Sequence, residues 1–150
     1  MADRHEVQPH HVLRAVLGDG YAAELLAAVG SSAQELRLTL DGLWLEASEE
    51  IGPEEIGAVG IDVATLLALL NPPYDGAVAA DGRRLTEPAR DVLVAALRTN
   101  ASMRHPRTGT GHLLVALLRS RDPLVSATCT AHRVPVRAVT DLVATRGRRA

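Results

Sequence analysis

Hydrophobic positions recur at helical spacing along most of the chain. Leu36, Leu40 and Leu43 follow one another at intervals of three or four residues, and Val92 and Ala96 repeat the interval later in the sequence. This spacing places apolar side chains on one face of a helix. No stretch shows the sustained alternation of polar and apolar residues that is typical of a strand. The pattern therefore predicts an all-α protein of about eight helices.

Capping residues and turns divide this pattern into separate helices. Ser32, Thr86, Thr110 and Asp122 are each predicted to cap the helix that follows them. The predicted helices cover residues 9–17, 21–29 and 33–47, a short helix ending at 70, residues 87 up to a break at 104, residues 111–119 and 123–131, and a last helix from about 135. Asp62 is predicted to cap the short helix. The stretch "NPPYDGAVAADG" (71–82) is predicted to be a loop between two structural units.

Composition indicates one aliphatic core. The chain has 150 residues, nearly half of them hydrophobic, with no Phe, one Trp (Trp44) and two Tyr. This length fits a single domain over residues 1–150. The lone Cys129 excludes an internal disulfide framework and is compatible with a reducing compartment. No apolar run approaches the ~20 residues that would span a bilayer. We therefore expect a cytoplasmic protein that does not enter the membrane.

Candidate catalytic and metal-binding chemistry is sparse. Lysine is absent, so no phosphate-loop lysine and no "GxxxxGK[ST]" motif can occur. His5, His10 and His11 cluster in sequence, but we expect the rings of the last two to point to different helix faces, and no further residues with ligand spacing accompany them. His112 is predicted to be a packed, hydrogen-bonded residue and Cys129 a small core residue. We expect no enzyme activity, no bound metal and no cofactor.

Charge is distributed unevenly. Residues 38–82 carry nine acids and no arginine, whereas residues 83–150 carry thirteen arginines and four acids. The arginine-rich half leaves open a second hypothesis, a DNA-binding regulator. Against it, the arginines are scattered along the chain and not gathered on one recognition helix. The alternative is that the two halves neutralise each other within the fold.

A short pattern occurs twice. "EVQPHHVLRAVL" (6–17) and "RTGTGHLLVALL" (107–118) each run from a turn into "HxLxAxL", starting at His11 and His112. Both copies continue as helix, break, helix, break and helix. Repetition of a whole group of helices predicts two tandem units related by a pseudo-two-fold axis.

The second unit resembles a known family. The segment "LTEPARDVLVAALRTNASMRHPRTGTGHLLVALLRSRDPLVSATCTAHRVPVRAVTDLV" (85–143) is similar to the second repeat of the Clp N-terminal domain, the substrate- and adaptor-receiving module of Clp-type AAA+ unfoldases. The stretch "VQPHHVLRAVLGDGYAAELLAAVGSSAQELR" (7–37) is similar to the first repeat from its second helix onward, and "VGIDVATLL" resembles a linker of actinobacterial members. The resemblance implies a first repeat over about 5–47 without its opening helix, a linker with an extra helix over about 48–84, and a second repeat over 85–145.

The resemblance also indicates which residues would contact a ligand. Thr86 stands where the family has a ligand-contacting threonine, and Leu85 replaces an aromatic residue. Gly111 and His10 replace, in the two copies, the acid that in some members helps hold the guanidinium group of phosphoarginine. Neither offers the carboxylate that a guanidinium prefers.

The expected function follows from the resemblance. The chain would be a non-enzymatic module that binds protein segments, adaptors or small ligands of Clp unfoldases. It would act as an adaptor, decoy or regulator of Clp-dependent proteolysis. The expected binding surface lies near Thr86 and Gly111 in one half and near His10 in the other.

Overall fold

The computed structural model describes residues 6–47, 63–70 and 84–147. These residues form eight helices and two short strands: β1 (Glu6–Val7), α1 (Pro9–Leu17), α2 (Gly20–Ala28), α3 (Ala33–Ala47), α5 (Val63–Leu70), β2 (Arg84–Leu85), α6 (Glu87–Met103), α7 (Thr110–Leu118), α8 (Pro123–Ala131) and α9 (Val136–Gly147). The predicted all-α class is confirmed. No helix in the described ranges is both long and apolar enough to cross a membrane.

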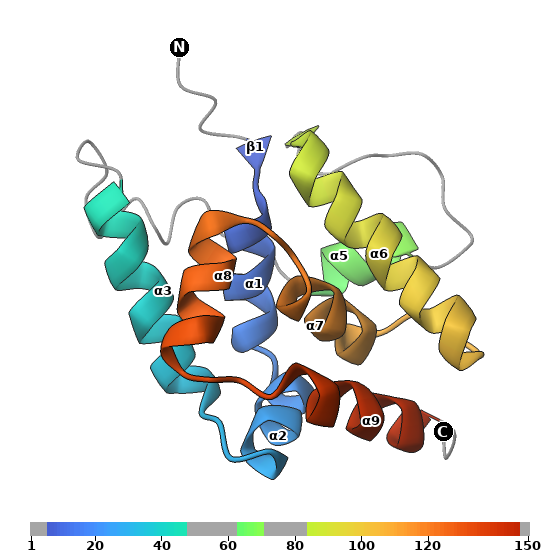
Figure 1. Cartoon of the computed structure of the whole chain (residues 1–150). Helices are drawn as coiled ribbons and strands as arrows, with labels where there is room; N and C mark the ends of the chain where they lie inside the picture. The colour runs from blue at the N-terminus through green and yellow to red at the C-terminus, as the bar shows by residue number, and fades with distance from the viewer. Residues whose placement is uncertain (1–5, 48–62, 71–83, 148–150) are drawn as a thin grey trace.

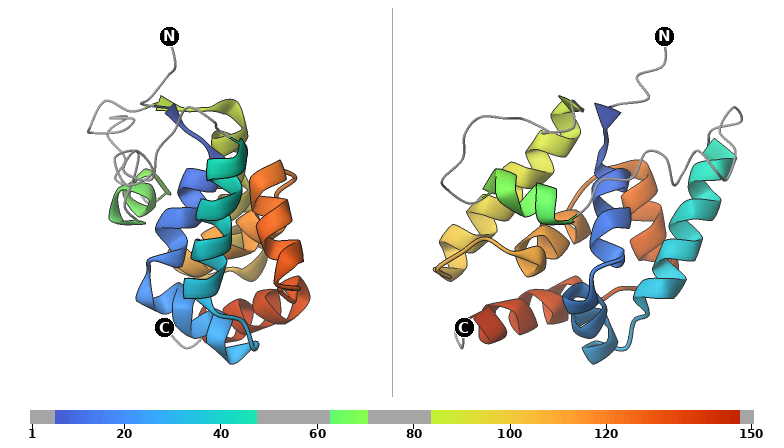
Figure 2. Two further views of the ribbon diagram at one scale, coloured as in Figure 1. Left: turned by 90° about the vertical axis from the view of Figure 1, so that its left-hand side faces the viewer. Right: turned by 180° about the vertical axis from the view of Figure 1, so that it is seen from behind.

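Helices α1 and α7 lie at the centre of the fold and contact each other (Figure 1). Every residue of α7 from Thr110 to Leu117 is buried, as are most residues of α1. A helix that is buried all round needs neighbours on every side. Helices α3, α8 and α5 pack on α1, while α6, α2 and α9 pack on α7 (Figure 2).

Most predicted helix starts are confirmed by capping hydrogen bonds. The side chains of Ser32, Thr86 and Asp122 accept the N–H groups of residues 35, 89 and 125 at 3.3, 3.3 and 3.1 Å. Two predicted starts were wrong by one residue. Helix α2 begins at Gly20 because Asp19 caps it, and α7 begins at Thr110, so that Thr110 is not the cap.

The two strands were not predicted from the sequence. Glu6 and Val7 pair in parallel with Arg84 and Leu85. Thr86 extends this contact, because both its N–H and its hydroxyl donate to the Val7 carbonyl, at 3.0 and 3.2 Å. Two-residue strands are too short to show alternation. The pairing fixes the start of α6 beside the start of α1.

Helix α5 follows α3 in the described chain and packs on α1 through its own apolar face. Its Leu66 is fully buried and Leu70 nearly so. The predicted short helix ending at 70 is thereby confirmed. The predicted Asp62 cap and the predicted loop over 71–82 lie outside the described residues, as does most of the predicted linker.

Candidate functional site

The two central helices start with the same contact. His11 is the third residue of α1, and its Nδ1 accepts the Gln8 N–H at 2.9 Å. His112 is the third residue of α7, and its Nδ1 accepts the Gly109 N–H at 2.8 Å. A side chain at this position that reaches back to the capping residue satisfies a donor at the helix start. The predicted structural role of His112 is confirmed. The contact also explains why Gly109, and not Thr110, caps α7.

A second histidine extends the contact at α7. His112 Nε2 lies 2.8 Å from His105 Nδ1, and His105 Nε2 lies 3.2 Å from the Ala144 carbonyl in α9. Because the Gly109 N–H is a donor, His112 Nδ1 must be an acceptor, and its proton sits on Nε2. His112 then donates to His105, and His105 donates to Ala144. Burial, followed by the nearby His105, lowers the pKa of His112 to about 4.

At α1 the equivalent region is an aromatic cluster. The rings of His10 and His11 lie 4.2 Å apart, and each packs edge-on against Trp44 of α3, at 4.7 and 4.9 Å between ring centroids. The expectation that the two histidines point to different faces was therefore wrong. Consecutive helical side chains diverge at Cβ, but both rings turn toward the one large indole.

His10 is the unusual member of this cluster. It is only 5% exposed, and its Nε2 has no hydrogen-bond partner in the part of the chain that the structure describes. Burial lowers the pKa of His10, while the charge of Asp122 acts in the opposite direction. The neutral form of the His10 ring is therefore favoured. In the family that the sequence resembles, some members have an acidic residue at this position.

In the structure, the candidate ligand residues Leu85 and Thr86 lie near His10 and not near Gly111. Leu85 pairs with Val7, and Thr86 donates to the Val7 carbonyl, so both lie next to the start of α1, the helix that carries His10. We expected Thr86 to lie near Gly111. This was wrong, because α6 and α7 run antiparallel (Figure 1).

Gly111 instead lies by the far end of α6. The Asn100 side chain, near that end, donates to the Thr108 hydroxyl at 2.9 Å, just before α7 begins. A Cβ atom added at Gly111 would lie 3.0 and 3.2 Å from the two methyl groups of Val143 and 3.6 Å from the Tyr21 ring. Gly111 is therefore a packing position between α7, α9 and α2.

We expect Gly111→Ala to lower the free energy of unfolding by about 1 kcal/mol, and Gly111→Glu by about 2 kcal/mol. Val143 is 3% exposed and β-branched, so it cannot rotate away from a new Cβ. Gly42→Ala in α3 is the matched control, since a Cβ there meets nothing within 4 Å. It should raise stability by up to about 1 kcal/mol through helix propensity. Urea unfolding measures all three variants; equal gains at both glycines would contradict the packing argument.

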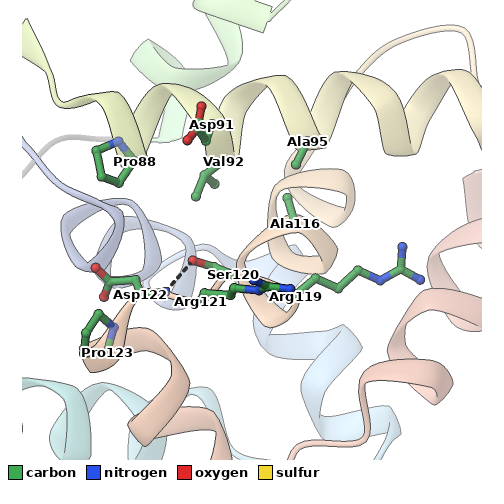
Figure 3. Close-up of a pocket in the computed structure, with 10 residues that line it drawn as sticks. All are labelled: Pro88, Asp91, Val92, Ala95, Ala116, Arg119, Ser120, Arg121, Asp122 and Pro123. Carbon is green, nitrogen blue, oxygen red and sulfur yellow. Dashed lines mark hydrogen bonds between the residues drawn. The ribbon is translucent and has the colours of Figure 1, made fainter.

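An open groove separates α6 from the connection between α7 and α8 (Figure 3). Its volume is about 470 Å³. The residues that matter below are Asp91, Val92 and Ala95 from α6, Ala116 and Arg119 from α7 and its C-terminus, and Asp122 at the start of α8. The Asp122 N–H donates to the Ser120 hydroxyl at 3.1 Å, which fixes this wall of the groove.

This groove was not predicted from the sequence. Asp122 was predicted only as a cap, a role that it has. Its charge also acts on His10, so it connects the groove with the cluster of His10, His11 and Trp44. The alanines at positions 95 and 116 could have indicated the groove only weakly, because small side chains at facing positions of two helices leave room between the helices.

Cys129 has little nucleophilic character. It is partly buried, packs against the core, and burial raises its pKa to about 11. The thiolate, which is the reactive form, is therefore scarce at neutral pH. Among the described residues, no group of three or more His, Cys, Asp or Glu side chains is placed to hold a metal ion.

Comparison with known proteins shows the fold alone. No family model and no curated protein matches the chain. A solved structure described as "Preliminary structural investigations of a malarial protein secretion system" matches with a TM-score of 0.66 and 16% sequence identity. The match covers 97% of this chain and 82% of that one. At this identity the likeness supports the helical arrangement and carries no activity across.

Proposed function

We propose that the chain is a cytoplasmic, non-enzymatic binding module built from two tandem Clp-N-type repeats. In this interpretation α1–α3 and α7–α9 are the equivalent units, and α6 is the opening helix of the second. Equivalent contacts support it: α1 packs on α3 as α7 packs on α9, and α1 and α7 contact each other. The matching caps at His11 and His112 support it further.

Helix α5 fits the same proposal. Helix α6 packs along α7, and α5 packs on α1. The resemblance implies a linker with an extra helix between the two repeats. The buried Leu66 and Leu70 of α5 are consistent with a linker helix that packs on the first repeat.

The observation that carries the binding function is the open groove between α6 and the α7–α8 connection. Open concave surfaces with a few polar groups over an apolar floor are the usual form of a binding site. The groove sits on two helices that are themselves fixed by the core, and such rigid support suits recognition of a partner segment. We infer that the protein receives segments of proteins handled by Clp unfoldases, as an adaptor, decoy or regulator.

Affinity capture from lysate of the source organism tests this proposal. The full chain is the bait, and the retained proteins are identified by mass spectrometry. We expect Clp subunits, adaptors or protease substrates. A purified Clp unfoldase and protease should then degrade a captured substrate at an altered rate when the chain is added. Recovery without any Clp component or substrate, or an unchanged rate, would overturn the proposal.

The DNA-binding alternative rests on the arginines of the second half, whose exposed members include Arg90, Arg98, Arg119, Arg133 and Arg137. They lie on α6, on α9 and in the connections that flank α8. A DNA-binding protein should bind duplex DNA at low salt and lose it steeply as salt rises. Salt-independent or absent retention would exclude this alternative.

A further inference from the structure

The groove continues along the seam between α6 and α7. A second hollow of about 230 Å³ shares Ala95, Ala116 and Arg119 with the first and extends past Arg98. Together they form one channel, which we call the α6–α7 groove. It runs from the start of α6 almost to the end of that helix, at Ser102, and is open to solvent.

The floor of the α6–α7 groove is made of small apolar residues. Ala95 and Ala116 face each other across the seam, with Val92 beside them. Ala116 is only 3% exposed, so it is the bottom of the channel and not part of its rim. Side chains this small let the backbone of another chain approach closely. The channel therefore suits an extended segment better than a bulky ring system.

Charged side chains of both signs line the groove. Asp91 and Asp122 stand on opposite walls at one end, where Arg121 precedes Asp122 in the chain, and Arg119 reaches toward the other end, where Arg98 lies (Figure 3). Among the described residues, neither Arg98 nor Arg119 is found in an ion pair; the pair of Arg14 with Asp41 joins α1 to α3 and does not line the groove. The groove arginines are thus exposed and have no carboxylate partner among these residues.

We propose that the α6–α7 groove binds an extended, acidic protein segment in one orientation. Carboxylates of the segment pair with Arg98 and Arg119, and a neutral or basic residue lies between Asp91 and Asp122. Arginine forms directional, charge-assisted bonds to carboxylates, so it sets register as well as affinity. This inference rests on the proposed function, to which it adds the chemical class of the bound segment.

A nucleic acid fits the same groove less well. A phosphate backbone carries charge at every step and would place phosphates against Asp91 and Asp122. The floor also offers no aromatic ring on which bases could stack. The charge pattern matches a segment that is acidic at one end only.

Fluorescence anisotropy with defined peptides tests the proposal. The probe is a labelled peptide with glutamates alternating with alanines in one half and glutamines in the other half. We expect the Arg98→Glu/Arg119→Glu variant to weaken its binding at least about tenfold. The control variant is Arg133→Glu/Arg137→Glu, which changes net charge equally at exposed positions outside the groove. It should change affinity less than about twofold, as expected of remote surface charge. Circular dichroism verifies that both variants are folded.

Two further probes define the ligand class and its orientation. An all-glutamine peptide should bind at least about tenfold more weakly, and a single-stranded oligonucleotide of equal charge should bind more weakly than the acidic peptide. Asp91→Asn should strengthen binding of a peptide that is acidic throughout but not of the half-acidic one. Equal effects of the groove and control variants, or tighter binding of the oligonucleotide, would overturn the inference. Because the peptides need no Clp component, this result is independent of the capture experiment.

Discussion

Trp44→Ala is expected to lower the free energy of unfolding by about 3 kcal/mol, the usual cost of truncating a buried tryptophan. Trp44 is 3% exposed, and its indole covers the rings of both His10 and His11. Its loss leaves a cavity between α1 and α3 next to the imidazole of His10, whose Nε2 has no hydrogen-bond partner among residues 6–47, 63–70 and 84–147. Water entering that cavity would relieve part of the desolvation of His10 but not restore the packing.

Leu38→Ala is the matched control, because Leu38 lies on the same helix α3 and is 65% exposed. It should change stability by less than about 0.5 kcal/mol. Urea unfolding followed by far-UV circular dichroism suits both variants, since Trp44 is the only tryptophan and its removal abolishes the fluorescence signal. Trp44→Phe should recover part of the loss by restoring a ring against the histidines. A loss no larger than that of Leu38→Ala would show that α1 does not depend on this cluster.

The helices could be predicted from sequence because their signals are local. Pro9 at the first position and Gly18 after the last define α1, and the predicted range 9–17 is the observed one. The start of α7 was missed by one residue because its cap depends on a histidine ring and not on a hydroxyl. The pairing of β1 with β2 joins residues almost eighty positions apart, which no local pattern reveals.

The candidate site depends on contacts that sequence spacing does not show. His105 meets His112 only because the chain turns back after α6, where Arg104 adopts a left-handed conformation with φ 61°. The residue in this conformation at the end of a helix is usually a glycine. Because the chain has an arginine there, the turn could not be predicted from the sequence. The separation of Thr86 from Gly111 has a similar origin, since it follows from the antiparallel packing of α6 on α7. The groove between those helices is a property of packing and could not be read from either helix alone.

The contact between His105 and His112 makes the fold sensitive to acid. In the folded chain His112 accepts at Nδ1 and donates at Nε2, and His105 uses both of its nitrogens as well. A proton added to His112 Nδ1 would point at the Gly109 N–H and break that hydrogen bond. The folded protein therefore resists protonation of His112, consistent with its pKa of about 4.

This resistance fixes the direction of the pH dependence. The unfolded chain takes up a proton on His112 as the pH falls below about 6.5, whereas the folded chain does so only near a pH of about 4. The unfolded state then binds more protons, so stability falls as the pH drops through this window. The separation corresponds to about 3 kcal/mol when fully developed. The lowered pKa of His10 adds a loss in the same direction.

His112→Gln separates the proton effect from the structural one. Glutamine at the third position of a helix can still accept the N–H of the capping residue Gly109, but it does not titrate. We expect a variant about 1 kcal/mol less stable than the natural chain at pH 7.5, as for one weakened hydrogen bond. Its stability should fall less between pH 6.5 and 4, so the two curves should converge or cross. Urea unfolding at several pH values, followed by Trp44 fluorescence, measures both curves. Parallel curves would mean that the acid sensitivity arises elsewhere, and that the His105–His112 contact serves only to hold α7 and α9 together.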